Sequence, residues 1–298
     1  MSYAPYTPMI EAARHRPALW RLIAGAVTAI LLTFLWAGAA ILAVALVEGE
    51  GLASAMRLMF GGAADVPSRS ILYLVLVGGL AFATLAAAAL WQGRSRQSLI
   101  GRGPRVLRHF AIAAGITLLV ASVLFLARSL AQGETGVVRN LDLSTWLFWL
   151  PFALVALVMQ TGAEELFFRG YLQSQLAARF RSPILWLVLP ALLFGFAHFA
   201  PGLPGGNAWL YVGFAALFGL LAGDLTARTG SLGAAWGWHF GNNALAVLVV
   251  ATEGSVTGLG FWRTNESLLE PITLSPFMLF DVLILLGVWY AIRRATAS

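Results

Sequence analysis

The stretch WLFWLPFALVALVMQTGAEELFFRGYLQSQLAA, residues 146–178, decides the fold class. Its apolar run exceeds the roughly 20 residues that a helix needs to cross the hydrocarbon core of a membrane. Three charged side chains nevertheless lie inside it, Glu164, Glu165 and Arg169. A charge at membrane depth costs at least a few kcal/mol and usually faces the bundle interior, where it serves a function. The stretch therefore predicts a transmembrane helix that carries a functional cluster.

The composition extends this interpretation to the whole chain. Of 298 residues, 59% are hydrophobic and 11% are charged, whereas a soluble domain has about a quarter charged residues. The chain has no cysteine, which excludes disulfides, thiolate metal sites and a cysteine nucleophile. The net charge of +6 comes from arginine alone, and in a membrane protein it indicates orientation more than nucleic-acid binding.

Apolar segments of membrane-spanning length recur along the chain, and we expect an all-α polytopic bundle of about eight transmembrane helices. Placing the N-terminus inside puts most arginines on the inner side, so the positive-inside rule predicts that both termini are cytoplasmic. The eight predicted spans are 20–47, 71–91, 110–130, 146–178, 183–199, 208–228, 231–251 and 276–292.

One predicted inner loop, residues 92–109, is rich in arginine. The simpler interpretation is an anchor that sets the orientation of the neighbouring spans. The alternative is a segment that binds anionic lipid headgroups.

The first polar cluster separates into a pair and a single acid. Glu165 and Arg169 are four residues apart, so they share one helix face and can form an ion pair. Glu164 is turned about 100° from Glu165 and lacks such a partner. A catalytic carboxylate and a structural Glu–Arg lock with a spare acid both fit this pattern.

Two further clusters carry histidine. Phe194-Gly-Phe-Ala-His198 closes one predicted span, and His239-Phe-Gly-Asn-Asn243 places a histidine and an amide on one face at i, i+4. Glycines at 233, 237 and 241 form a ridge on another face of that helix. The ridge suits close packing inside one bundle or, alternatively, against a partner helix.

Spacing connects the first two clusters. The turn at Arg181-Ser182-Pro183, with Ser182 as the expected N-cap, lies midway between Glu164 and His198. Equal arms of an antiparallel hairpin bring equal depths together, so we expect Glu164 beside His198. His239 lies closer to its own turn by roughly 7–13 Å of helical rise, which is the weakest step. The remaining histidines, His15 and His109, lie among arginines and are expected to be solvated.

The three clusters, E164-E165-x-x-x-R169, F194-x-x-x-H198 and H239-x-x-x-N243, together resemble the signature of the CPBP (or ABI) family. That family holds type II CAAX prenyl endopeptidases and bacteriocin-processing or bacteriocin-immunity membrane proteins. The resemblance divides the chain into flanking helices at 1–144, a catalytic core at 145–250, and an outer loop with the last helix at 251–298. It implies a membrane protein of a bacterial-type inner membrane.

The resemblance also implies an activity and a role for each motif residue. The activity is that of an intramembrane endopeptidase acting on a membrane-associated peptide, and the likeness to CAAX endopeptidases suggests a lipidated one. Glu164 and His198 would activate a water, and His239 and Asn243 would hold the oxyanion. The supporting residues would be Glu165, Arg169 and Phe194.

The chemistry of these residues leaves the question of a metal open. Peptide hydrolysis needs an activated water, a proton donor and an oxyanion stabiliser, which carboxylate, imidazole and amide groups can supply without a cofactor. Zinc is the alternative, with Glu164, His198 and His239 as its ligands. The absence of H-E-x-x-H and the presence of an asparagine favour the metal-free mechanism.

Two other classes of function remain open. Buried carboxylates and histidines also mark proton-coupled transporters, although those commonly show inverted repeats that this sequence lacks. A non-catalytic immunity or scaffold protein would use the glycine ridge to bind another helix. The expected partners are membrane lipids and the peptide substrate, without nucleic acid.

Overall fold

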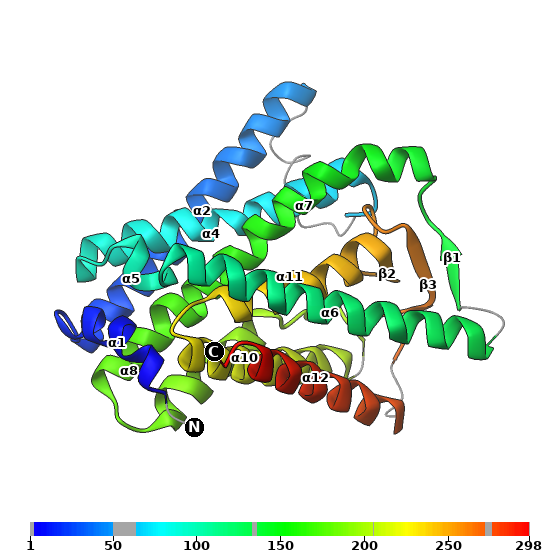
Figure 1. Ribbon diagram of the computed structural model, residues 1–298. Helices are drawn as coiled ribbons and strands as arrows, with labels where there is room; N and C mark the ends of the chain where they lie inside the picture. The colour runs from blue at the N-terminus through cyan, green and yellow to red at the C-terminus, as the bar shows by residue number, and fades with distance from the viewer. Residues whose placement is uncertain (1–2, 50–63, 133–135, 205, 272–275, 298) are drawn as a thin grey trace.

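Long apolar helices make up most of the computed structural model, which describes residues 3–49, 64–132, 136–204, 206–271 and 276–297 (Figure 1). The longer helices run along one another and form an all-α bundle, as the composition predicts. They are α2 (Leu19–Glu48), α4 (Pro67–Gln92), α6 (Gly103–Gln132), α7 (Leu143–Glu165), α10 (Asn207–Thr229), α11 (Gly233–Ala244) and α12 (Pro276–Ala295).

Five helices among the described residues are long and apolar enough to cross a membrane. They contain all of the predicted spans 20–47, 71–91, 146–178 and 208–228, and the predicted span 110–130 as far as Ala127; the fourth is one continuous helix over Leu143–Arg179. Of the other three predicted spans, 183–199 coincides with the shorter apolar helix Ile184–Ala197, 231–251 contains α11, and 276–292 lies within α12. Helix α9 (Leu189–Ala197) with its preceding turns ends at Ala197, and the predicted span 231–251 is wrong at its end, where Val250 starts strand β2. The count of eight spans therefore stays a prediction.

Local signals in the sequence set several helix ends. Asp142 caps α7, because its Oδ1 accepts a hydrogen bond of 2.9 Å from the Thr145 amide. Gly230 ends α10 with φ +62°, a left-handed conformation that favours glycine. The N-cap expected at Ser182 is wrong, since Pro183 occupies that position and its turn has no side-chain cap.

Large apolar side chains cover the outside of the bundle. Leu46, Leu107 and Val155 are each about two-thirds exposed or more, at 74%, 71% and 68%. Such faces would be costly in water and match the hydrocarbon interior of a membrane. The bundle therefore has the apolar outer surface of an integral membrane protein.

The glycine ridge of α11 packs inside the bundle. A Cβ on Gly233 would lie 2.2 Å from the carbonyl oxygen of Val106, and one on Gly237 would lie 2.2 Å from that of Phe110, both on α6. Backbones approach this closely only where side chains are absent. The ridge is thus occupied by α6 and is not left open for a partner helix.

Short elements close the two ends of the bundle (Figure 1). At one end, β1 (Val137–Arg139) pairs antiparallel and β2 (Val250–Glu253) pairs parallel with the central strand β3 (Trp262–Ser267). At the other end lie the N-terminus, α1 (Thr7–Arg14), α5 (Arg96–Ile100) and α8 (Ser174–Arg179).

The arginine-rich segment 92–109 contains two buried residues that the sequence does not reveal. Arg94 is 4% exposed and donates hydrogen bonds to the Ser174 hydroxyl and the Met9 carbonyl, and burial lowers its pKa to about 10. His109 is 3% exposed, and its Nδ1 lies 3.2 Å from the Ser231 hydroxyl, so the expectation that it is solvated is wrong. Both residues hold elements of this end together.

Candidate active site

The polar cluster begins where the long helix changes its winding. Glu164 and Glu165 are the last residues of α7, and residues Leu166–Gln173 continue as a π-helix, η2. A π-helix has hydrogen bonds from i to i+5 and often occurs at functional sites. Because its turns are wider, the length along the helix axis from Glu164 to the turn at residues 181–183 is shorter than for an α-helix of the same number of residues.

Glu165 is fully buried and has two partners. The Arg169 Nη1 donates to its Oε1 at 2.9 Å, and the His239 Nδ1 donates to the same oxygen at 2.8 Å. The pair expected from the i, i+4 spacing is therefore present. Because a carboxylate only accepts, this contact places a proton on Nδ1 of His239 and fixes the orientation of the ring.

Aromatic rings enclose the Glu165–Arg169 pair. The Arg169 guanidinium carbon lies 4.2 Å from the centre of the Phe194 ring and 5.7 Å from that of Phe218. The same two rings lie 5.8 Å and 5.1 Å from the His239 ring. This wall excludes water from the pair and stacks favourably on the cation.

Glu164 has one hydrogen-bonded carboxylate oxygen and one buried oxygen without a hydrogen-bond partner in the part of the chain that the structure describes. Its Oε1 accepts a hydrogen bond of 2.8 Å from the Gln160 amide. Its Oε2 lies 3.6 Å from Nε2 of His239 and has no hydrogen-bond partner among the described residues. The side chain as a whole is 13% exposed, but Oε2 itself is buried.

Gln160 connects Glu164 to Asn243. The Asn243 Nδ2 donates to the Gln160 Oε1 at 3.2 Å, while the Gln160 Nε2 donates to Glu164. Sequence reasoning missed this glutamine. Its signal was the same i, i+4 spacing, here toward Glu164, combined with a polar residue at membrane depth.

His198 approaches the cluster through Phe194. It ends α9, its Nδ1 donates to the Phe194 carbonyl at 2.8 Å, and its ring lies 4.5 Å from the Phe194 ring. No hydrogen bond or ion pair joins His198 directly to Glu164 in the described part of the chain. The bond to the carbonyl leaves Nε2 as the acceptor of the neutral ring.

The depth of His239, the weakest step in the sequence argument, is resolved by the contacts with Glu164 and Glu165. The arms that carry Glu164 and His198 are also shorter than α-helical rise predicts, since π-helical turns occur both at η2 and at η3 (Ile184–Val188). The three motifs thus meet from three separate segments: the end of α7, the end of α9 and the middle of α11.

The zinc alternative needs three ligands that converge on one point. Within the described residues, no three His, Asp or Glu side chains gather in the manner of a metal site. His239 also uses its Nδ1 for Glu165, and His198 uses its Nδ1 for a carbonyl, so each has one nitrogen left.

Comparisons with known proteins agree with the resemblance seen in the motifs. Residues 143–245 match the family model described as Rce1-like, type II CAAX prenyl endopeptidase Rce1-like. The uncharacterized protein YyaK of Bacillus subtilis (strain 168) is 31% identical over 121 residues, 40% of each chain. The chain therefore matches well under two thirds of that relative's length. No solved structure matches.

Proposed function

From an Rce1-like domain at residues 143–245 of an integral membrane protein, we propose that this chain is an endopeptidase with Glu164 as its general base. The observation that carries the proposal is the free Oε2 of Glu164, directed at His239 while Gln160 holds the other oxygen. A carboxylate that is held in position and has one oxygen without a hydrogen-bond partner can take a proton from water.

In the proposed reaction, Glu164 takes a proton from a water as the water oxygen attacks the scissile carbonyl. The carbonyl oxygen then becomes an oxyanion, which accepts hydrogen bonds from Nε2–H of a protonated His239 and from the Asn243 amide. Glu164 passes its proton to the leaving amine as the C–N bond breaks. Glu164 thereby returns to its carboxylate, whereas the water is consumed: its oxygen stays in the new carboxyl group and the proton that Glu164 took ends on the amine.

Charge balance supports a protonated His239. Two carboxylates, Glu164 and Glu165, face a single buried arginine, so a second positive charge compensates the second carboxylate. A positive charge on the His239 ring also makes the 3.6 Å distance between its Nε2 and the Glu164 Oε2 favourable. Glu165 and Arg169 then act as positioning residues, which hold His239 through its Nδ1.

His198 contributes a second acceptor in this proposal. With Nδ1 fixed on the Phe194 carbonyl, its Nε2 is available to orient the attacking water. Phe194 keeps both rings in place, since it contacts His198 on one side and His239 on the other.

The substrate that we propose is a membrane-associated peptide, with a lipidated peptide as the form that the likeness to CAAX prenyl endopeptidases favours. We further propose a bacterial-type inner membrane, cytoplasmic termini and a catalytic core at 145–250 flanked by 1–144 and 251–298. Membrane lipids are the other expected partner.

The test compares membrane peptide fragments from cells that express wild type or Glu164→Gln at equal levels. We expect the fragments of the substrate to disappear in the variant, because an amide cannot take the proton. Glu266→Gln, an exposed carboxylate in β3, is the matched control and should cleave normally. Unchanged cleavage by Glu164→Gln would refute the proposal.

A separate measurement addresses the metal. Elemental analysis of active purified protein, followed by chelation and metal add-back, distinguishes the two mechanisms. Full activity without zinc is the expected result. Stoichiometric zinc that is required for activity would refute the metal-free mechanism while leaving the endopeptidase assignment intact.

A further inference from the structure

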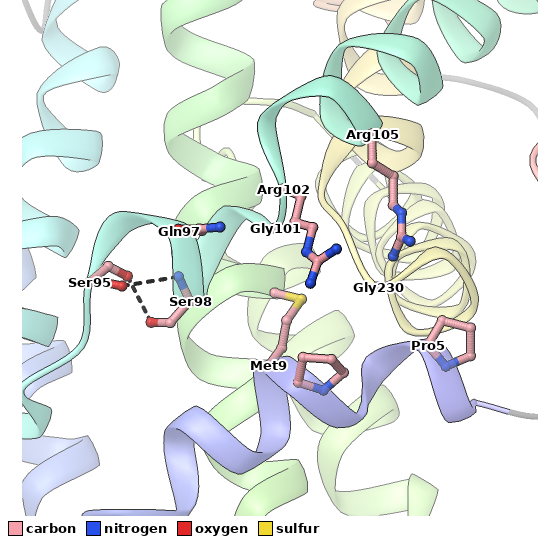
Figure 2. Close-up of a pocket in the computed structure, with 10 residues that line it drawn as sticks. Pro5, Met9, Ser95, Gln97, Ser98, Gly101, Arg102, Arg105 and Gly230 are labelled. Carbon is pink, nitrogen blue, oxygen red and sulfur yellow. Dashed lines mark hydrogen bonds between the residues drawn. The ribbon is translucent and has the colours of Figure 1, made fainter.

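A cavity separate from the candidate active site lies at the end of the bundle that holds the N-terminus. It measures about 430 Å³ and is lined by three chain segments: the N-terminal turn with α1, the segment from Ser95 through α5 to Arg105 in α6, and the glycine that ends α10 (Figure 2). This size is within the usual range of small-ligand sites, roughly 300–1,000 Å³. The cavity shares no residue with the polar cluster of the active site.

The charge of the lining is entirely positive. Arg102 and Arg105 both line the cavity, and the lining contains no aspartate or glutamate. Their side chains point the same way, Arg102 toward Met9 and Arg105 toward Gly230 (Figure 2). Neither guanidinium forms an ion pair within the described residues, so both remain available to an anion.

The backbone around the cavity is fixed. The Leu232 amide donates to the Ile100 carbonyl at 3.0 Å, and the packing of Gly101 against Gly230 leaves no space for a Cβ. The buried Arg94 binds the Met9 carbonyl and the Ser98 carbonyl, which tie the first helix to α5. Preorganised walls of this kind reduce the entropy lost when a ligand binds.

The position of the cavity indicates the source of its ligand. Helix α4 ends at Gln92, α6 begins at Gly103 and α10 ends at Thr229, so three candidate membrane spans terminate beside it. The ends of membrane spans lie at the level of lipid headgroups. Two arginines at that level meet the phosphates of anionic lipids, to which guanidinium groups bind through paired hydrogen bonds.

We propose that this cavity binds a phosphate group through Arg102 and Arg105, supplied by the headgroup of an anionic phospholipid. The site is distinct from general attraction of the arginine-rich segment to a negative surface, because it requires these two side chains. It is also independent of the proposed hydrolysis, since its residues lie outside the catalytic cluster.

The experiment is native mass spectrometry of the purified full chain, titrated with phosphatidylglycerol or phosphatidylcholine. The wild-type protein should bind phosphatidylglycerol in preference to phosphatidylcholine. The double variant Arg102→Gln/Arg105→Gln should bind it at least about tenfold more weakly. Arg96→Gln/Arg181→Gln removes the same charge from exposed arginines outside the cavity and should keep the preference.

Equal losses in the two double variants, or no preference for phosphatidylglycerol in wild type, would overturn the proposal. A second arm titrates glycerol phosphate and inorganic phosphate in detergent. Lipid binding without an effect of these soluble anions supports the headgroup as the source. Tight binding of a soluble anion that Arg102→Gln/Arg105→Gln abolishes, without lipid preference, would retain the phosphate site but refute its lipid source.

Discussion

The buried Glu165–Arg169 pair allows a prediction with a magnitude. Arg169→Met removes the cation and leaves the carboxylate in a wall of aromatic rings. At 2.9 Å and an effective dielectric constant of about 20, the Coulomb attraction of the pair is about 6 kcal/mol. Removing one partner of a buried pair costs about 3–5 kcal/mol of folding stability, and the remaining bond from His239 places this case near 3 kcal/mol.

The double variant Glu165→Gln/Arg169→Met separates charge burial from loss of packing. A neutral amide still accepts a hydrogen bond from His239, so most of the lost stability should return, leaving a deficit of about 1 kcal/mol. The assay is unfolding in mixed micelles at increasing sodium dodecyl sulfate, followed by tryptophan fluorescence. Both variants should lose catalytic activity, because the orientation of His239 depends on the pair.

A half-exposed pair is the control. Arg263 and Glu253 also lie 2.9 Å apart, but their side chains are 42% and 38% exposed. Arg263→Met should therefore cost about 1 kcal/mol or less. If Arg169→Met unfolds at the wild-type midpoint, or if the double variant is no more stable than the single one, the reasoning about buried charge is refuted.

Three further predictions concern positioning, pH and packing. Gln160→Met should lower kcat by about ten- to a hundredfold with little change in KM, and its effect should not add to that of Asn243→Ala in a double-mutant cycle; additive effects would argue against the bridge. Asp142 has a pKa below its ordinary value, because a side-chain hydroxyl and a backbone amide of the next turn donate to it. The stabilising effect of the Asp142 carboxylate is therefore present above about pH 4 and is lost as the pH falls further. The difference in unfolding midpoint between wild type and Asp142→Asn should shrink from about pH 6 to about pH 3. A constant difference would contradict this explanation. Gly237→Ala should destabilise the fold by about 1–3 kcal/mol through the facing carbonyl of α6, whereas Gly115→Ala, where a Cβ meets open space, should be neutral or stabilising; equal effects would refute close packing as the cause.

The sequence predicts the helical class and the pairing of Glu165 with Arg169 because both depend on local patterns. Apolar length indicates membrane spans, and i, i+4 spacing indicates shared faces. The family resemblance of the three motifs is confirmed for residues 143–245.

Other features depended on geometry that no local pattern carries. The π-helical turns alter the depth arithmetic, and the contacts of His239 with both glutamates depend on how separate helices pack. The three-stranded sheet pairs β1 with β3 across more than a hundred residues of sequence. Val250 enters the same sheet as the first residue of β2, so the predicted helix through Val250 ends early. Burial of His109 against Ser231 joins segments far apart in the sequence, so neighbouring arginines misleadingly indicated solvent.

The carbonyls of Val106 and Phe110 that occupy the ridge on α11 have a consequence for how the chain can be divided. They belong to α6, outside the part of the chain that matches the Rce1-like family. A shortened protein that begins at α7 would expose three glycines and the backbone between them, on the helix that carries His239. The Rce1-like segment is therefore not an interchangeable module, and transplanting it would require a donor helix with backbone exposed at the same spacing.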